Sequence, residues 1–150
     1  MAALADGGFV VSWNKHVSGA GNNTGDRYDL IGRQFDASGT PVSDEFTINS
    51  TPTYMDYPPA VTGLPNGGFV VAWDGHYNYP TDIDIGIRAR VFDDNANGGA
   101  EIDADKFDVI TGWDSPVTVT DLADGGFVVT YSAHRSRLAD RTFIGQRFDS

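Results

Sequence analysis

The stretch Gly7-Gly8-Phe9-Val10-Val11-Ser12-Trp13 decides the fold of this 150-residue chain, because the sequence contains three versions of it. The second is Gly67-Gly68-Phe69-Val70-Val71-Ala72-Trp73, and the third is Gly125-Gly126-Phe127-Val128-Val129-Thr130-Tyr131. The second version begins 60 residues after the first, and the third begins 58 residues after the second. A nearly fixed period of this size indicates a repeat architecture.

Each version predicts a β-strand, because Phe, Val and an aromatic residue alternate with Val and a small residue. Both sets are largely apolar, so we expect the strand to be covered on both faces. Asp6-Gly7, Asn66-Gly67 and Asp124-Gly125 precede the three strands. These dipeptides predict two-residue hairpin turns in which both central residues have a positive φ.

The full repeat unit is predicted to be a four-stranded antiparallel meander with strands A, B, C and D; the first repeat has only a stub of strand A, and the third stops before any strand D. The repeated stretch is strand B. The other predicted strands are 1–4, 59–64 and 117–122 for A, 30–36, 87–93 and 143–149 for C, and 45–49 and 106–110 for D. We expect one repeat domain over 1–150, with units at approximately 1–51, 52–112 and 113–150, and no helix of useful length.

A repeated four-stranded meander that is apolar on both faces is typical of a β-propeller blade. The predicted fold class is therefore all-β, with four-stranded antiparallel blades of the propeller type, about two and a half per chain. A set of two and a half blades is not closed, so the first and last blades expose strand edges and blade faces. We expect self-assembly into a homo-oligomer, two chains supplying about six blades; a longer repeat protein and an open array are the alternatives.

The pattern Leu-x-[Asp/Asn]-Gly-Gly-Phe-Val-Val-x-[Trp/Tyr], with x-Phe-Asp-x-x-Gly after it, resembles repeats of large bacterial secreted adhesins and hemolysin-type (RTX-like) calcium-associated proteins. The blade pattern is also similar to sialidase-like propellers. The resemblance implies an extracellular or cell-surface location, although no signal peptide is visible after Met1. The chain lacks the glycine-aspartate nonapeptide array that binds calcium in RTX segments, so calcium does not follow from the resemblance.

The composition of the chain limits the kinds of partner that we expect it to bind. The net charge of −11 argues against nucleic acid, whose phosphates need a basic surface. No apolar run approaches the roughly 18 residues of a membrane helix, so we expect no membrane insertion. Of the 21 acidic residues all but Glu45 and Glu101 are Asp, a residue suited to turns and to hard cations. The absence of Cys excludes disulfides and thiolate metal sites.

The B–C and D–A loops of such a meander lie on one edge of each sheet, and here they are long and rich in aromatic residues. Glycans need aromatic faces for their CH groups and carboxylate or amide groups for their hydroxyls. We therefore expect these loops to bind a glycan; the alternative is that the aromatic side chains only pack the loops together. The candidate residues are Tyr54, Tyr57, Tyr77, Tyr79, Trp113 and Asp74.

All three histidines of the chain follow the B strands at one spacing. His16, His76 and His134 each come three residues after the aromatic residue that ends the repeated stretch: Trp13, Trp73 and Tyr131. Three hypotheses remain open: one ligand site per blade, a transition metal shared by the three imidazoles, or a His that packs on its own Trp or Tyr at the strand end and is present three times only through duplication.

Two acidic segments are candidate calcium sites. Asp93, Asn95 and Asn97 match the first half of a calcium loop, but Ala104 occupies the position of its usual glutamate. Asp82 and Asp84 form a second candidate. The alternative for 93–98 is a polar hairpin.

The leading functional hypothesis is a non-catalytic binding or adhesion module. A calcium-assisted structural spacer is the second, and a sialidase-like glycosidase or metal-dependent hydrolase is the third. An enzyme is less expected, because the only two glutamates lie near the D strands, away from the loops, and no common hydrolase motif is found.

Overall fold

The computed structural model is all-β. It describes residues 1–17, 27–53, 57–76, 85–104, 116–134 and 141–149, and these residues form three antiparallel sheets with no helix. The first sheet has the order β1 (Ala2–Ala3), β2 (Phe9–Val17), β3 (Arg27–Phe35), β4 (Phe46–Thr47). The middle sheet has the order β5 (Ala60–Gly63), β6 (Phe69–His76), β7 (Ile85–Phe92), β8 (Gly98–Asp103). The third sheet contains β9 (Thr118–Asp121), β10 (Phe127–His134) and β11 (Arg141–Phe148).

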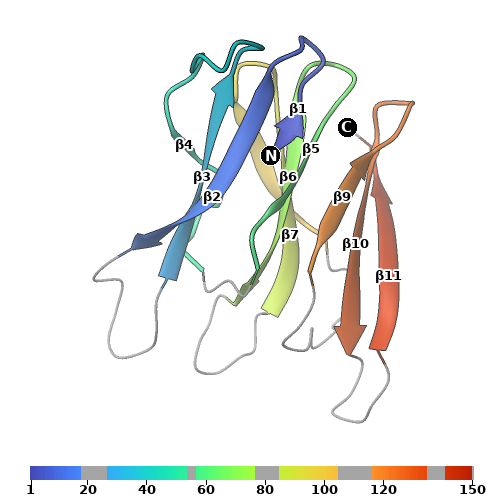
Figure 1. Cartoon of the computed structure of the whole chain (residues 1–150). Coiled ribbons are helices and arrows are strands. Elements are labelled where there is room, and N and C mark those ends of the chain that lie inside the picture. Colours follow the sequence, from blue (N-terminus) through green and yellow to red (C-terminus); the bar gives the residue numbers. More distant parts are fainter. Residues whose placement is uncertain (18–26, 54–56, 77–84, 105–115, 135–140, 150) are drawn as a thin grey trace.

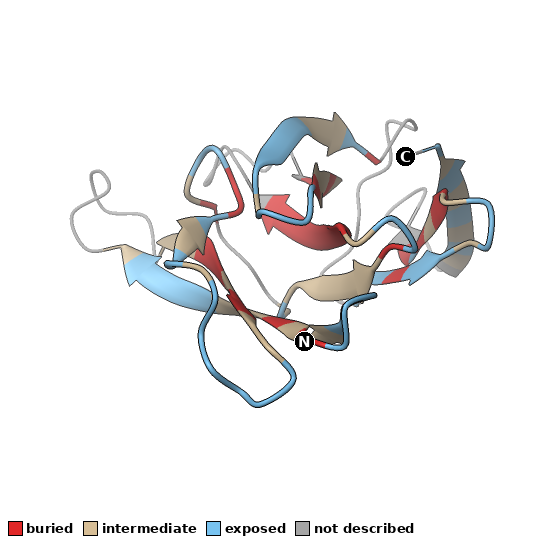
Figure 2. Ribbon diagram, turned by 90° about the horizontal axis from the view of Figure 1, so that it is seen from above, coloured by how far each residue is buried: buried red, intermediate tan, exposed pale blue. Residues whose placement is uncertain are grey.

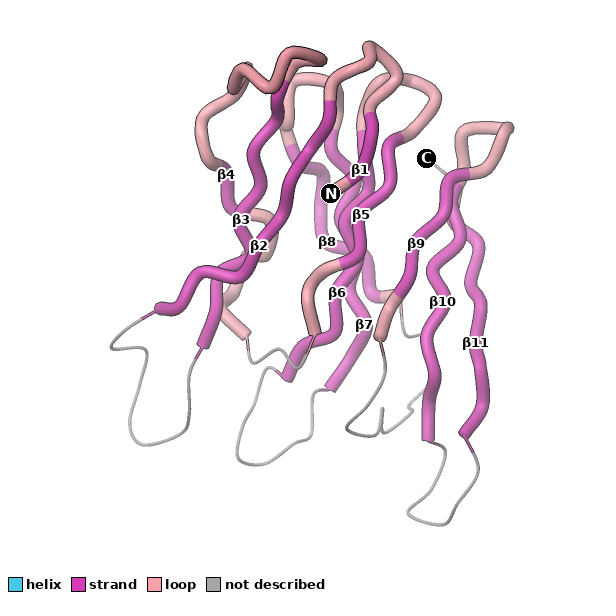
Figure 3. Tube along the Cα trace, viewed as in Figure 1, coloured by secondary structure: helices cyan, strands magenta, loops and turns pink. Residues whose placement is uncertain are grey.

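The three sheets stand side by side in chain order (Figure 1). Their short first strands are neighbours, because β1 contacts β5 and β5 contacts β9. The view from above shows that the sheets fan out from this region (Figure 2), and the trace shows the same three-layer arrangement (Figure 3). The meander order predicted from the sequence is thus confirmed within each sheet.

The turn before each B strand differs from the prediction. In the first sheet the Gly7 amide donates to the Leu4 carbonyl at 3.1 Å, and the Leu4 amide donates to the Gly8 carbonyl at 2.9 Å. Only the glycine of the predicted pair has a positive φ, at 86°, 93° and 92° in the three copies. The loop therefore has three residues, a turn followed by a left-handed residue, and the predicted two-residue turn with two positive φ values is wrong.

The second glycine of each pair is required by close approach of the backbone. A Cβ at Gly8 or Gly68 would collide with the carbonyl oxygen of Phe35 or Phe92, at the end of the neighbouring C strand. A Cβ at Gly126 would lie 2.7 Å from the corresponding oxygen of Phe148. The Gly-Gly pair of the repeat is therefore explained by two independent needs, a positive φ and a missing side chain.

The fourth strand of the middle sheet lies earlier in the chain than predicted. Ala89 of β7 pairs with Ile102, as Gly32 of β3 pairs with Phe46 in the first sheet. The strand beside β7 is therefore Gly98–Asp103, and the prediction of residues 106–110 for this place is wrong. The similarity between the sequences around Phe46 and Phe107 misled the prediction, because strand pairing follows distance along the hairpin.

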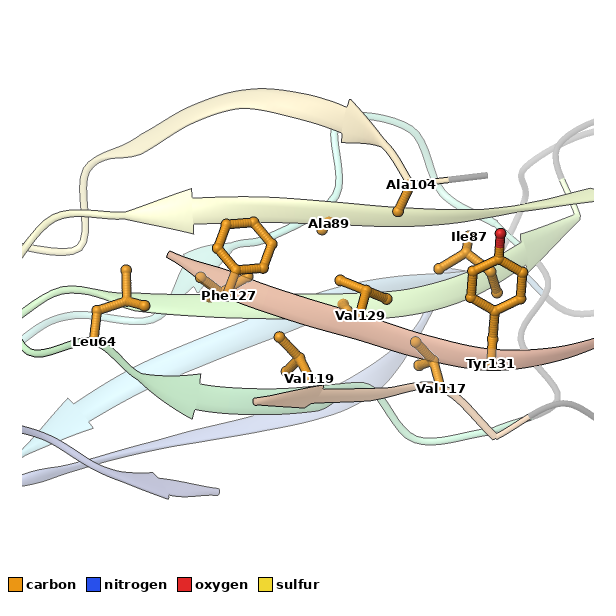
Figure 4. Packing of buried hydrophobic residues seen from close by; sticks show 11 residues of the cluster. Leu64, Ile87, Ala89, Ala104, Val117, Val119, Phe127, Val129 and Tyr131 are labelled. Atoms are coloured by element: carbon orange, nitrogen blue, oxygen red, sulfur yellow. The ribbon is translucent and has the colours of Figure 1, made fainter. Parts of the chain in front are cut away.

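We call the face of each sheet that carries the Phe of the repeated stretch its front face, and the opposite face its rear face. The middle sheet packs its front face on the rear face of the first sheet, and its rear face on the front face of the third sheet. The core between the first and middle sheets contains Leu4, Val10, Leu30, Ile48, Phe69, Val71, Trp73 and Phe92. Figure 4 shows the core between the middle and third sheets, which includes Val70, Ala72, Phe127, Val129 and Tyr131.

Burial on both faces is thus confirmed for the middle sheet alone. Phe69, Val71 and Trp73 are completely buried on its front face, and so are Val70 and Ala72 on its rear face. The first and third sheets each bury one face against the middle sheet.

Side chains of β3 and β7 form hydrogen bonds between the first and middle sheets. Nη1 of Arg90 donates to the Ile48 carbonyl at 2.9 Å, and Nε2 of Gln34 donates to the Asp94 carbonyl at 3.2 Å. These bonds hold neighbouring sheets in one register, which apolar packing alone does not fix.

Candidate functional site

The three B–C hairpins end at one edge of the three sheets, which we call the loop edge. In Figure 1 it is the lower edge, where β2, β6 and β10 end. His16 pairs with Tyr28, His76 with Ile85 and His134 with Arg141, so the three histidines occupy the same register position in the three sheets. The prediction that they share one end of their sheets is confirmed. The side chains of His76 and His134 lie outside the described part of the structure.

His16 and Tyr28 form an exposed ring pair at the loop edge. Their ring centroids are 5.7 Å apart at an interplanar angle of 70°, an edge-to-face contact. The His16 residue is exposed and Tyr28 is partly exposed. The hypothesis that His16 packs on Trp13 is wrong, because residues three apart in a strand point to opposite faces.

The backbone behind this ring pair is fixed by the buried Asn49. Its Oδ1 accepts from the Leu30 amide at 2.7 Å, while its Nδ2 donates to the carbonyls of Tyr28 at 3.2 Å and Thr51 at 2.9 Å. Thr53 then pairs with Tyr28 in an isolated bridge. Asn49 thus fastens the start of the D–A segment to β3 beside the loop edge. Sequence analysis missed it, because its partners are 19 and 21 residues away.

The aromatic residues that end the B strands belong mainly to the core. Trp73 is completely buried and Tyr131 is 2% exposed, so both rings stabilise the contacts between sheets. Trp13 is partly exposed on the front face of the first sheet. Alternation along β2 places Trp13 on the opposite face from His16, so these two side chains do not form a common surface.

The remaining candidates fall into two groups. Asp74 is 7% exposed, within the middle sheet, and Tyr57 is partly exposed. Tyr54, Tyr77, Tyr79, Trp113, Asp82 and Asp84 lie outside the described residues.

The acidic segment that starts at Asp93 forms a tight hairpin. The Asp93 carboxylate accepts from the Asn95 amide at 2.9 Å, from the Asn97 amide at 2.7 Å and from Nδ2 of Asn97 at 2.8 Å. Bonds from the Asn97 side chain, then from its backbone, hold the pKa of Asp93 below its ordinary value of 3.8. Because β8 begins at Gly98, the segment follows the polar-hairpin alternative and does not wrap a twelve-residue ion loop.

The corresponding turn of the first sheet has the same design. The Asp36 carboxylate accepts from the Ser38 hydroxyl at 2.6 Å and from the Thr40 amide at 2.8 Å. These bonds, led by the Ser38 hydroxyl, lower the pKa of Asp36 as well. Both carboxylates therefore serve their own turns.

Within the described residues, no three carboxylates and imidazoles gather as a metal ligand set would. A search of the same residues finds no helix with the length and hydropathy of a membrane span. An open hollow of about 420 Å³ lies between the first strands of the sheets, beside Ala3, Gly63, Leu64 and Asp121. Its one carboxylate, that of Asp121, already accepts from the Thr62 hydroxyl at 3.3 Å.

Comparison of the chain with protein-family models, with curated proteins and with solved structures gave no match.

Proposed function

We propose that this chain is a non-catalytic binding module made of propeller-type blades, and that it binds glycans at the loop edge. Support for the blade assignment comes from the antiparallel meander in each sheet and from the contacts of β1 with β5 and of β5 with β9. In a propeller the blades are arranged around a central channel. The resemblance to secreted adhesin repeats supports a location outside the cell or on its surface.

The observation that carries the binding proposal is the repeated histidine. His16, His76 and His134 share one register position, yet the residues that face them across the hairpin are Tyr28, Ile85 and Arg141. A packing partner on the facing strand is therefore not the common reason for the three histidines. The two residues before each histidine differ among the three copies while the histidine is the same, which supports a function shared by the three loop ends, with one ligand site per sheet as its simplest form.

The chemistry of this edge suits a sugar. An imidazole donates or accepts hydrogen bonds, and an aromatic ring such as that of Tyr28 offers a face for CH groups. In the sequence, the loop after β6 carries Tyr77 and Tyr79, the loop after β2 carries Asn22 and Asn23, and the loop after β10 carries Asp140. Loops held by a rigid sheet are the usual place for such recognition.

A glycan array tests this proposal. We expect the wild-type chain to bind one class of glycan, and the triple variant His16→Ala/His76→Ala/His134→Ala to lose that binding. Lys15→Ala is the matched control, since Lys15 is an exposed neighbour on the same strand. An array without any bound glycan, or a triple variant that binds like the wild type, would refute the proposal.

A calcium-assisted spacer is the second proposal, favoured by the serial packing of sheets through two separate cores. It assigns calcium to Asp82 and Asp84 of the B–C loop in the middle repeat. The spacer proposal predicts a melting temperature that rises with millimolar calcium and a blank glycan array.

A further inference from the structure

The two outer faces of the molecule are complementary in sequence. The front face of the first sheet carries Phe9, Val11 and Trp13, and no described sheet lies on it. The same positions in the middle and third sheets are at most 2% exposed, because each packs on the sheet before it. The first sheet therefore presents a surface of the type that is buried at both internal junctions.

The rear face of the third sheet matches the buried rear face of the first sheet at successive register positions. The pairs Val10↔Gln34 and Ser12↔Gly32 in the first sheet correspond to Val128↔Arg147 and Thr130↔Gly145 in the third. Each position keeps its character: a valine, a hydroxyl residue, a glycine and a long polar side chain. The middle sheet packs its front face on this pattern in the first sheet.

Phe143 gives the strongest indication that the rear face of the third sheet is covered by a partner. It pairs with Ser132 in the third sheet, which is the position of Leu30 in the first sheet and of Ile87 in the middle sheet. Leu30 and Ile87 are completely buried at the internal junctions, whereas Phe143 is 85% exposed. An exposed aromatic residue of this kind, in a row of matched positions, marks a surface that a partner covers.

We infer that a second copy of this chain packs head to tail on the first, with the front face of its first sheet on the rear face of the other copy's third sheet. The contact continues the internal junctions with the same residue types, which identifies the partner as another sheet of this repeat. It joins two different faces, so it is heterologous and builds a ring or an open row of copies. This inference does not depend on the glycan proposal.

The experiment measures mass in solution by light scattering, at about 50 µM and about 0.5 M salt to screen the net charge of −11. We expect the wild type to exceed the 16.1 kDa of one chain. Phe143→Asp blocks the rear face without touching a core, and should weaken association by at least about thirtyfold, the effect of an interface hot spot. Val42→Asp is the control, since Val42 is 62% exposed outside both faces.

A mixing experiment tests the head-to-tail arrangement itself. Val11→Asp blocks the front face. If this variant does not fold, Arg33→Glu is used in its place, because Arg33 is paired with Val11 in the first sheet. Each single variant should be monomeric, whereas an equal mixture of a front variant and Phe143→Asp should form a complex of two chains. A monomeric wild type at 50 µM overturns the inference, as does a Phe143→Asp chain that still associates with itself.

Discussion

The phenylalanine of the repeated stretch allows one test of the whole arrangement, because it is completely buried in two sheets and partly exposed in the other. Phe69 and Phe127 are completely buried, and Phe9 is partly exposed. Each stacks on the last residue of its C strand, with centroids 5.1, 4.8 and 5.2 Å apart in the first, middle and third sheets. The three replacements by Ala remove the same stacked pair and differ mainly in the neighbouring sheet.

We expect Phe69→Ala and Phe127→Ala each to lower the free energy of unfolding by about 3–5 kcal/mol, as for other buried phenylalanines. Phe9→Ala loses the stack, about 0.5–1.5 kcal/mol, and part of one face, so its total should be about 1–2 kcal/mol. The difference of about 2–3 kcal/mol is the contribution of the adjoining sheet.

Urea unfolding measures these values, and the Phe143→Asp background keeps association of copies out of the comparison. With unchanged slopes, the midpoint of the Phe9→Ala variant should exceed that of Phe69→Ala by about 1 M or more. An equal loss in the first and middle sheets would show that the front face of the first sheet is covered within a single chain, and would refute the packing described above.

Three further predictions concern turns and the loop edge. Gly39→Ala should cost about 1 kcal/mol in thermal unfolding, because Gly39 has a φ of 84° and no atom near the added methyl group, while Gly39→Asn should cost less. Asn49→Ala removes three hydrogen bonds of a buried side chain and should cost about 2–4 kcal/mol by urea unfolding. The lowered pKa of Asp93 means that its ionised form stabilises the fold above pH 3.8 and that this stability is lost as the pH falls through the folded-state pKa. The melting temperatures of the wild type and Asp93→Asn should therefore differ at pH 6 and converge below pH 3.8, and a difference that persists in acid would contradict this.

The repeated stretch was sufficient to predict the strand order, because alternation and turn residues are local signals. It could not predict which sheet is buried on both faces, since Phe9 and Phe69 stand in nearly identical sequences and differ only in their neighbours. The turn was assigned one residue too short, because Asp-Gly is compatible with both hairpin loops and the choice depends on Gly8 approaching the Phe35 carbonyl.

In the candidate site, too, the features that depend on neighbouring residues could be predicted from the sequence, and those that depend on residues far apart in the chain could not. The register of the histidines follows from their spacing after the B strands, so the sequence predicted their common edge. The anchoring role of Asn49 depends on Leu30 and Tyr28, which the chain brings close only after β3 and β4 have paired. The fourth strand of the middle sheet is hard to recognise from the sequence, because residues 98–103 contain no aromatic residue and Ile102 is their only β-branched one.

Duplication alone does not explain the two outer faces. Copying a repeat accounts for Phe9, Val11 and Trp13, because these residues match the middle repeat with no further requirement. Phe143 is different, since it is identical to neither Leu30 nor Ile87 at the equivalent positions. Duplication of the repeat alone therefore does not account for this residue. A change at a position 85% exposed to water carries no requirement for an apolar side chain, yet the residue is large and aromatic. Burial against another sheet requires an apolar side chain at this position but does not require a particular one. Phe143 is therefore the residue at which the head-to-tail junction is best tested.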